Sequence, residues 1–167
     1  MVESYRAIVQ LGNQPAALVL TRQNLPTLDR SQYAAASGTA RGGYVLADAP
    51  DGKPDVILLA TGSEVSLCLQ AQQQLAAEGI RARVVSLPCW ELFDAQTAAY
   101  RHSVLPPEVT ARVGVEMGVE LGWGKYLGTA GRFIGMSSFG ASAPAGVLLK
   151  HFGFTVENVV ATAKRAQ

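Results

Sequence analysis

The feature that most constrains the fold is a continuous apolar run at residues 55–60, followed at once by a helix signal. A run with no polar face is typical of a parallel strand that is covered by helices on both sides. Residues 61–64 read Thr-Gly-Ser-Glu, in which Ser63 is a suitable N-cap and Glu64 suits the positive end of a helix. We therefore expect a strand that leads directly into a helix, and Gly79 is placed to end that helix.

The same alternation continues toward the C-terminus. Strands are expected at 43–47, 80–87, 110–116 and 132–136, and helices at 63–78, about 91–100, 123–127, 144–151 and from Thr155 to about 165. Alternating strands and helices predict an α/β fold with a mostly parallel, doubly wound sheet flanked by helices. In the helix at 63–78, Gln72 interrupts the apolar face and Leu67 lies opposite that face, so we expect another element to cover part of its outer side.

The first 42 residues follow a different pattern. Residues 1–14 suit the end of a helix, and residues 15–21 form a short apolar run that suits a buried strand. Residues 22–42 are polar and aperiodic, which favours an interdomain linker. We expect residues 1–42 to be the least well packed part of the chain.

Composition narrows the function classes. The chain has 14 basic and 13 acidic residues, so a strongly basic surface for nucleic acid is not expected. No apolar run reaches the roughly 18 residues of a membrane span, and the N-terminus lacks a signal-peptide pattern. The two cysteines, Cys68 and Cys89, form neither a disulfide framework nor a metal spacing. A cytoplasmic protein with reduced thiols is the expectation.

The chain has few candidate catalytic groups, with only two histidines and two cysteines. His102 is expected at the surface, and His151 at the end of a helix, where the helix dipole favours its cation. Cys89 suits a structural role better than a catalytic one. Glu116 ends an apolar strand, which is a typical active-site position, and with Glu120 it could form a carboxylate pair. We favour hydrogen bonds from loop amides to Glu116 instead.

Two places could bind an anion. The helix start at Ser63 and Glu64 has free N–H groups, but Glu64 would repel an anion, so a simple capped helix start is favoured. Arg22 directly follows the apolar run at 15–21 and should project from the carboxyl end of that strand. An arginine there suits bidentate recognition of phosphate or carboxylate. Pairing of Arg22 with a linker carboxylate is an equally good interpretation of the residues alone.

Several segments resemble transketolase, in the same order as in that family. Residues 15–26 resemble the segment that ends its pyrimidine-binding domain, and the C-terminal domain is matched at residues 42–46, 60–65, 103–106, 135–144 and 152–155. The resemblance covers essentially the whole chain. It implies that residues 1–25 end the pyrimidine-binding domain, that 26–42 form a linker, and that 43–167 form the C-terminal domain.

The resemblance also implies a function. Transketolases use thiamine diphosphate with Mg²⁺ (or Ca²⁺) to move a two-carbon ketol unit between sugar phosphates in the pentose phosphate pathway, as homodimers. Arg22 matches the family arginine that contacts the substrate phosphate; no catalytic, cofactor-binding or metal residue is carried over. We therefore expect a fragment that is inactive alone and packs against the missing N-terminal and pyrimidine-binding domains. The alternatives are a stand-alone anion- or nucleotide-binding α/β module and a docking module for a separately encoded partner.

Overall fold

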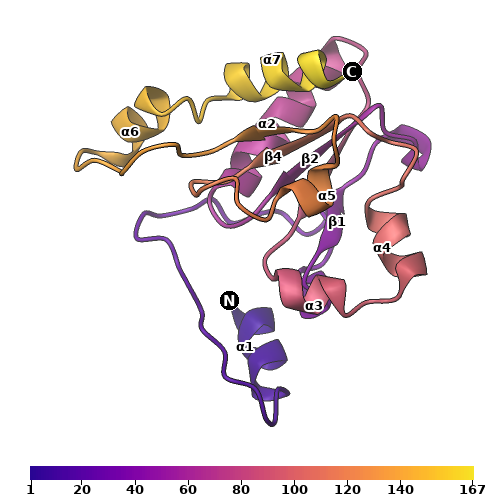
Figure 1. Ribbon diagram of the computed structural model, residues 1–167, viewed down its shortest axis with the longest axis vertical. Coiled ribbons are helices and arrows are strands. Elements are labelled where there is room, and N and C mark those ends of the chain that lie inside the picture. Colours follow the sequence, from indigo (N-terminus) through magenta and orange to yellow (C-terminus); the bar gives the residue numbers. More distant parts are fainter.

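A single five-stranded sheet forms the centre of the computed structural model, which describes residues 1–167. The strands are β1 (Tyr44–Ala47), β2 (Val56–Ala60), β3 (Ala82–Ser86), β4 (Arg112–Val115) and β5 (Arg132–Ile134), in the order β1-β3-β2-β4-β5. Four of them run parallel, and β1 pairs antiparallel with β3 at one edge. The mostly parallel sheet predicted from the sequence is thus confirmed (Figure 1).

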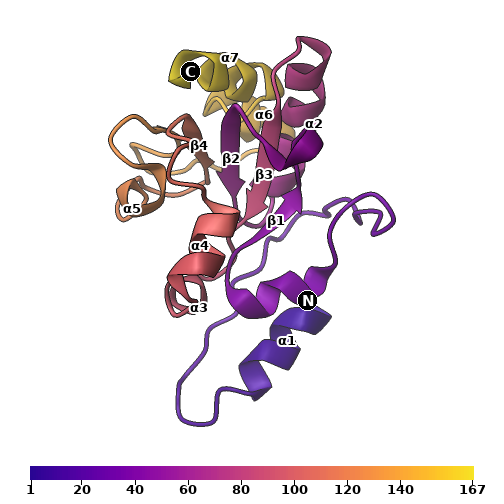
Figure 2. The same ribbon diagram turned by 90° about the vertical axis from the view of Figure 1, so that its right-hand side faces the viewer.

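Helices cover both faces of the sheet. The helices of the chain are α1 (Val2–Val9), α2 (Glu64–Ala77), α3 (Trp90–Asp94), α4 (Ala98–Val104), α5 (Gly124–Leu127), α6 (Ala145–His151) and α7 (Val156–Ala166), with 3₁₀ turns η1 (Ala36–Arg41) and η2 (Pro50–Gly52), and all but α1 lie near the sheet (Figures 1 and 2). None of these helices has the length and apolar character that crossing a membrane requires. The helices α2 and α7 lie on one face, and α3, α4 and α5 lie toward the other (Figures 1 and 2).

Strand β2 shows why the run at 55–60 has no polar face. All of its residues are fully buried, and Leu58 pairs with Val84 on one side and Val113 on the other. Leu58 belongs to the larger core cluster under α2 and α7, whereas Leu59 belongs to a second cluster with Phe93 and Trp123. A central parallel strand buries both faces, so each of its positions is apolar.

Helix α2 is covered along one flank only, and its outer residues Gln70, Gln73 and Gln74 are exposed, so the cover expected over its outer side is not seen. The C-terminal helix α7 packs against α2, and Leu67 is half-buried against the core. The polar Gln72 is explained by a backbone contact, because its amide donates to the carbonyl of Ala82 at 2.8 Å. A side-chain donor thereby satisfies a carbonyl near the end of the sheet.

One local prediction about the helices was wrong, and another is refined by the structure. Ser63 does not cap α2, because its backbone is already helical and its hydroxyl donates to Glu64 instead of accepting from the helix. The helical region expected at about 91–100 is confirmed but is divided into α3 and α4, since Thr97 has an extended backbone and its hydroxyl accepts from the amide of Tyr100 to begin α4. The predicted cap at Thr155 is confirmed by its bond from Asn158.

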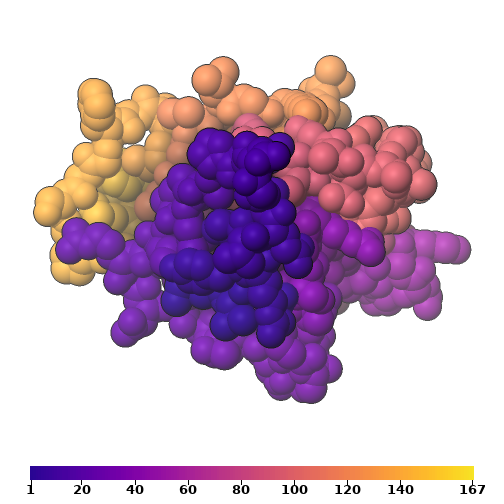
Figure 3. All heavy atoms as spheres, turned by 90° about the horizontal axis from the view of Figure 1, so that it is seen from below, coloured from indigo at the N-terminus to yellow at the C-terminus, as the bar shows by residue number.

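The N-terminal segment lies outside the packed sheet and helices. No residue before Gly42 is buried, which confirms that residues 1–42 are the least well packed part. Helix α1 stands apart from the sheet in Figures 1 and 2, and Figure 3 shows the first residues on the outer surface of the molecule. The strand expected at 15–21 is absent, because this segment pairs with no other strand and leaves Val19 90% exposed.

Candidate functional site at the carboxyl edge of the sheet

The carboxyl ends of the parallel strands meet at one edge of the sheet, where α/β proteins usually bind ligands. The turn after β2 leads into α2, and the chain after β4 carries residues 116–122. The linker also reaches this edge. Leu25 and Leu28 line a cavity of about 150 Å³ together with Gly62 and Ser86, which follow β2 and end β3. Three separate parts of the sequence therefore converge there.

Glu64 is the central charged group of this edge. It is buried, with 5% of its surface exposed. One carboxylate oxygen accepts from the Ser63 hydroxyl at 2.5 Å, and the other accepts from the backbone amide of Met117 at 3.4 Å. Burial raises the pKa of Glu64, and the nearby charge of Glu116 raises the pKa further. Glu64 thus ties the start of α2 to the loop after β4.

Glu116 has a different partner from the one expected. Its carboxylate accepts from the indole N–H of Trp123 at 2.8 Å, and no loop amide donates to its side chain. Glu120 is exposed and makes no side-chain hydrogen bond with Glu116, so the two do not form a bonded carboxylate pair. The charged neighbour of Glu116 is Glu64, which lies far away in the sequence.

The start of α2 is poorly suited to an anionic ligand. Glu64 places a carboxylate at the positive end of this helix and is buried there. A bound anion would lie close to this charge and to that of Glu116. The geometry therefore favours the interpretation of residues 61–64 as a helix start over the anion- or nucleotide-binding one.

Large apolar side chains are exposed in the loops that leave this edge. Met117, Val119 and Leu121 follow β4, and Phe139, which follows β5, is 97% exposed. We call these four residues the carboxyl-edge apolar patch. Exposed apolar groups on neighbouring loops are typical of a surface that meets another protein or domain.

Arg22 lies on the exposed N-terminal segment, three residues before Leu25 of the linker cavity. Its guanidinium makes no hydrogen bond or ion pair, so it is not paired with a linker carboxylate. Because residues 15–21 form no strand, the expectation that Arg22 projects from the end of a buried strand was wrong.

The histidines and cysteines form no catalytic cluster. His102 and His151 are both exposed, on α4 and α6, and His151 packs against the ring of Phe152. Both thiols are free; Cys68 is buried, and burial raises the pKa of Cys68 and of Cys89. A raised thiol pKa lowers the fraction of the nucleophilic thiolate. No three His, Cys, Asp or Glu side chains lie together as a metal-binding group.

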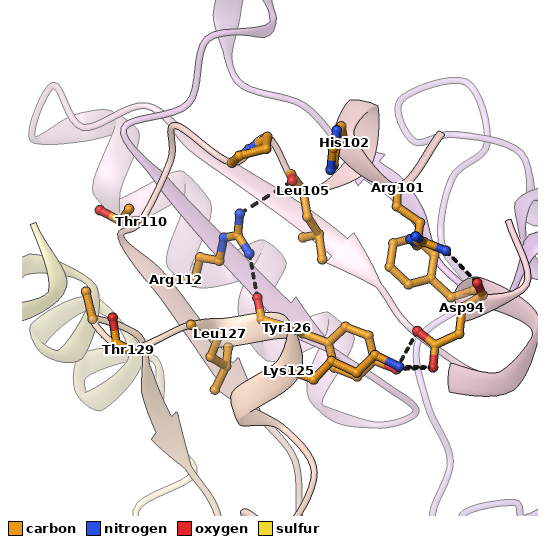
Figure 4. Close-up of a pocket in the computed structure, with 14 residues that line it drawn as sticks. Asp94, Arg101, His102, Leu105, Thr110, Arg112, Lys125, Tyr126, Leu127 and Thr129 are labelled. Atoms are coloured by element: carbon orange, nitrogen blue, oxygen red, sulfur yellow. Dashed lines mark hydrogen bonds and ion pairs between the residues drawn. The ribbon is translucent and has the colours of Figure 1, made fainter. Parts of the chain in front are cut away.

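A second concave region was missed by the sequence predictions. It has a volume of about 500 Å³ and lies between α4, α5 and the start of β4 (Figure 4). Arg101, Arg112, Lys125 and Asp94 contribute the charged groups. The only local signal was Arg112 within an otherwise apolar strand. The other residues join it only in three dimensions.

The fold and the carboxyl edge define an α/β domain with exposed apolar side chains at that edge. The family model of the transketolase-like C-terminal domain matches residues 42–155. Transketolase from Halalkalibacterium halodurans is 50% identical over 98% of this chain, and transketolase 1 from Vibrio vulnificus strain YJ016 is 53% identical over 96%. The chain therefore belongs to the transketolase family, as a C-terminal domain. It spans about a quarter of the length of these curated relatives, 24% in each case.

Solved structures of the family have the same fold. A transketolase mutant from Pichia stipitis superposes with a TM-score of 0.86 at 38% identity, over 98% of this chain and 23% of that one. Transketolase from Leishmania mexicana gives a TM-score of 0.71 at 50% identity, over 77% of this chain and 18% of that one. The expected transketolase C-terminal fold is confirmed.

Proposed function

We propose that this chain is the C-terminal part of a transketolase and that it supports assembly of the enzyme instead of performing the chemistry. The observation that carries the proposal is how much of each protein the match covers. The alignment with a transketolase at 50% identity includes 98% of this chain but only 24% of that transketolase. The full-length enzyme would transfer a two-carbon ketol unit between sugar phosphates, in the cytoplasm.

The proposed division of the chain follows the packing. Residues 43–167 hold the sheet and all but one of the buried residues, and are assigned to the C-terminal domain. Residues 26–42 are assigned to the linker and residues 1–25 to the end of the pyrimidine-binding domain. In that assignment the run at 15–21 gains strand partners from the rest of the pyrimidine-binding domain, which accounts for its exposed apolar side chains here.

The carboxyl-edge apolar patch is the proposed docking surface for the upstream domains or for the second subunit of a homodimer. Leu121 and Phe139 are almost fully exposed in this chain. Burying such side chains against another domain contributes about 1.5–3 kcal/mol each. This gives the patch a physical role that needs no catalytic group.

Cofactor binding is assigned to the upstream domains. Thiamine diphosphate with Mg²⁺ or Ca²⁺ is implied for the full-length enzyme, but no group of three metal-ligating side chains is found in this chain. A hard cation takes about six or more oxygen ligands. The residues present therefore do not fit the metal that accompanies the diphosphate.

Co-purification tests the assembly role. A tagged chain is mixed with a separately expressed protein that carries the N-terminal and pyrimidine-binding domains, and we expect a stable complex. Substituting Leu121 and Phe139 by Ser should weaken the complex at least tenfold, whereas substituting the exposed Val147 of α6, outside the patch, should change it less than twofold. Failure of the two proteins to associate at micromolar concentration would exclude the docking role.

Arg22 is the proposed contact to the substrate phosphate. Its guanidinium is exposed and unpaired in this chain, which leaves its donors free for a ligand. In the reassembled enzyme, Arg22→Gln should raise KM for a phosphorylated acceptor about tenfold and leave a non-phosphorylated acceptor unaffected. Arg6→Gln, which changes an exposed arginine of α1, is the matched control. Equal effects on both acceptors would contradict the phosphate contact.

A further inference from the structure

The cavity between α4, α5 and the start of β4 carries more positive than negative charge. Three cations, Arg101, Arg112 and Lys125, line it with a single acid, Asp94. Asp94 is already engaged, since it pairs with Lys125 and accepts from the Tyr126 hydroxyl at 3.2 Å. The two arginines have no carboxylate partner within the cavity.

Arg112 is half-buried with only carbonyl partners. Its guanidinium donates to the carbonyls of Val109 at 2.9 Å, Tyr126 at 2.7 Å and Pro106 at 2.8 Å. Burial lowers the pKa of Arg112, and the charge of Glu108 opposes this shift without a hydrogen bond. Carbonyl dipoles hold this guanidinium in place, but they do not cancel its charge.

Donors that face the cavity are left over. Arg101 uses only Nη1, at 2.6 Å from the carbonyl of Asp94 and 2.8 Å from that of Gln96, so its Nε and Nη2 hydrogens are free. Lys125 has one hydrogen-bond partner for three N–H groups. The hydroxyl of Thr129 and the ring of His102 also line the cavity and make no side-chain hydrogen bond. Figure 4 shows these labelled side chains around one hollow.

We propose that this cavity binds a small molecule through a phosphate group. The free donors come from α4, α5 and the loop before β5, and a phosphate presents more acceptor oxygens to such donors than a carboxylate does. A carboxylate, being planar and smaller, can meet fewer. The volume of about 500 Å³ lies in the range of small-molecule sites and leaves room for an organic part attached to the phosphate.

The site is separate from the surfaces used in the proposed function. Thr110 and Arg112 lie at the amino end of β4, whereas the carboxyl-edge apolar patch follows the other end of β4 and β5. The inference therefore does not rest on the assembly role, and each can fail without the other.

Titration with inorganic phosphate at constant ionic strength tests the proposal. We expect saturable shifts of the amides of His102, Lys125 and Thr129 in ¹⁵N-resolved NMR spectra, with a dissociation constant of about 1 mM. Acetate should bind at least about fivefold more weakly. If the shifts do not saturate at a phosphate concentration about twenty times this dissociation constant, or if acetate binds with equal affinity, the phosphate assignment is overturned.

Variants that remove the same charge inside and outside the cavity distinguish a defined phosphate site from general electrostatic attraction of phosphate to the protein. Lys125→Gln alone should weaken phosphate binding several-fold, and combining it with Arg101→Gln should weaken binding at least about tenfold. Lys150→Gln, on the exposed face of α6, removes the same charge outside the cavity and should leave binding within about twofold. Lys125 is exposed, so the single variant keeps the test valid if the double variant does not fold. Equal weakening in Lys125→Gln and Lys150→Gln would contradict a defined site.

Discussion

At the scale of single residues, the buried charge of Glu64 has a consequence for stability. Burial raises the pKa of Glu64 above its ordinary value of 4.5, so the folded protein holds this proton more tightly than the unfolded chain. The contribution of Glu64 to stability is therefore fully present below about pH 4.5 and is lost as the pH rises through the folded pKa.

Glu64→Gln should remove this pH dependence. We expect the free energy of unfolding of the variant, relative to the parent, to increase between pH 4.5 and neutral pH, because the variant has no carboxylate to ionise. Urea denaturation across that range measures the difference in the free energy of unfolding between variant and parent. The pH dependence caused by other carboxylates is the same in both proteins and cancels; Asp55, whose pKa is lowered by its bonds with Arg81, is one of these. A constant difference at every pH would show that Glu64 titrates normally.

Arg83 is a buried charged side chain with several hydrogen-bond partners. It is buried in β3 and binds both oxygens of Asp48, with Nε at 2.7 Å and Nη2 at 3.0 Å, and it donates to the carbonyl of Ser103 at 2.8 Å. Removing it takes one donor from each of these acceptors, and of the two Asp48 oxygens only Oδ1 keeps another donor, the amide of Ala49.

Arg83→Met should therefore destabilise the fold by about 3 kcal/mol, as measured by urea denaturation. The neighbouring Arg81 provides the control, because its ion pair with Asp55 is open to solvent. Arg81→Met should cost less than about 1 kcal/mol. Similar losses for the two variants would contradict the role given to the buried Arg83.

At the scale of elements, the junction between the linker and β1 depends on one glycine. Gly42 has φ +78°, and a Cβ there would lie 2.3 Å from both the carbonyl oxygen of Cys89 and the amide nitrogen of Phe93. Both atoms belong to the backbone, so the clash cannot be relieved by a side-chain rotation.

Gly42→Ala should therefore destabilise the protein by about 3 kcal/mol or more. Gly146→Ala in α6 is the matched control, since nothing lies within 4 Å of its would-be Cβ and its backbone is helical. That change should stabilise by about 0.5 kcal/mol. Thermal denaturation compares the two, and a tolerated Gly42→Ala would show that the linker joins the domain more loosely.

Elements that depend on local patterns could be predicted from the sequence. The apolar run of β2, the amphipathic α7 and its Thr155 cap all follow from neighbouring residues. The run at 15–21 was mispredicted because a strand also needs a partner, and the residues described provide none. Two features could not be predicted from local patterns, because they join residues far apart in the sequence. They are the bond between Glu64 and Met117 and the cavity around Arg112.

At the scale of the whole molecule, the packed domain and the N-terminal segment should differ in stability. No residue before Gly42 is buried, whereas β2 is fully buried between two parallel neighbours. We expect amides of residues 12–25 to exchange with solvent almost unprotected, and amides of β2 to exchange only on global unfolding. Hydrogen exchange measures both, and protection of residues 12–25 equal to that of β2 would contradict this division.

The central claim is that the chain is a structural part of a transketolase and depends on other domains for its chemistry. A steady-state assay of ketol transfer tests it most directly, with purified chain, thiamine diphosphate, Mg²⁺ and pentose phosphates, and with a full-length transketolase as positive control. We predict no turnover above background from the chain alone. Sustained turnover by the purified 167-residue chain would contradict the claim.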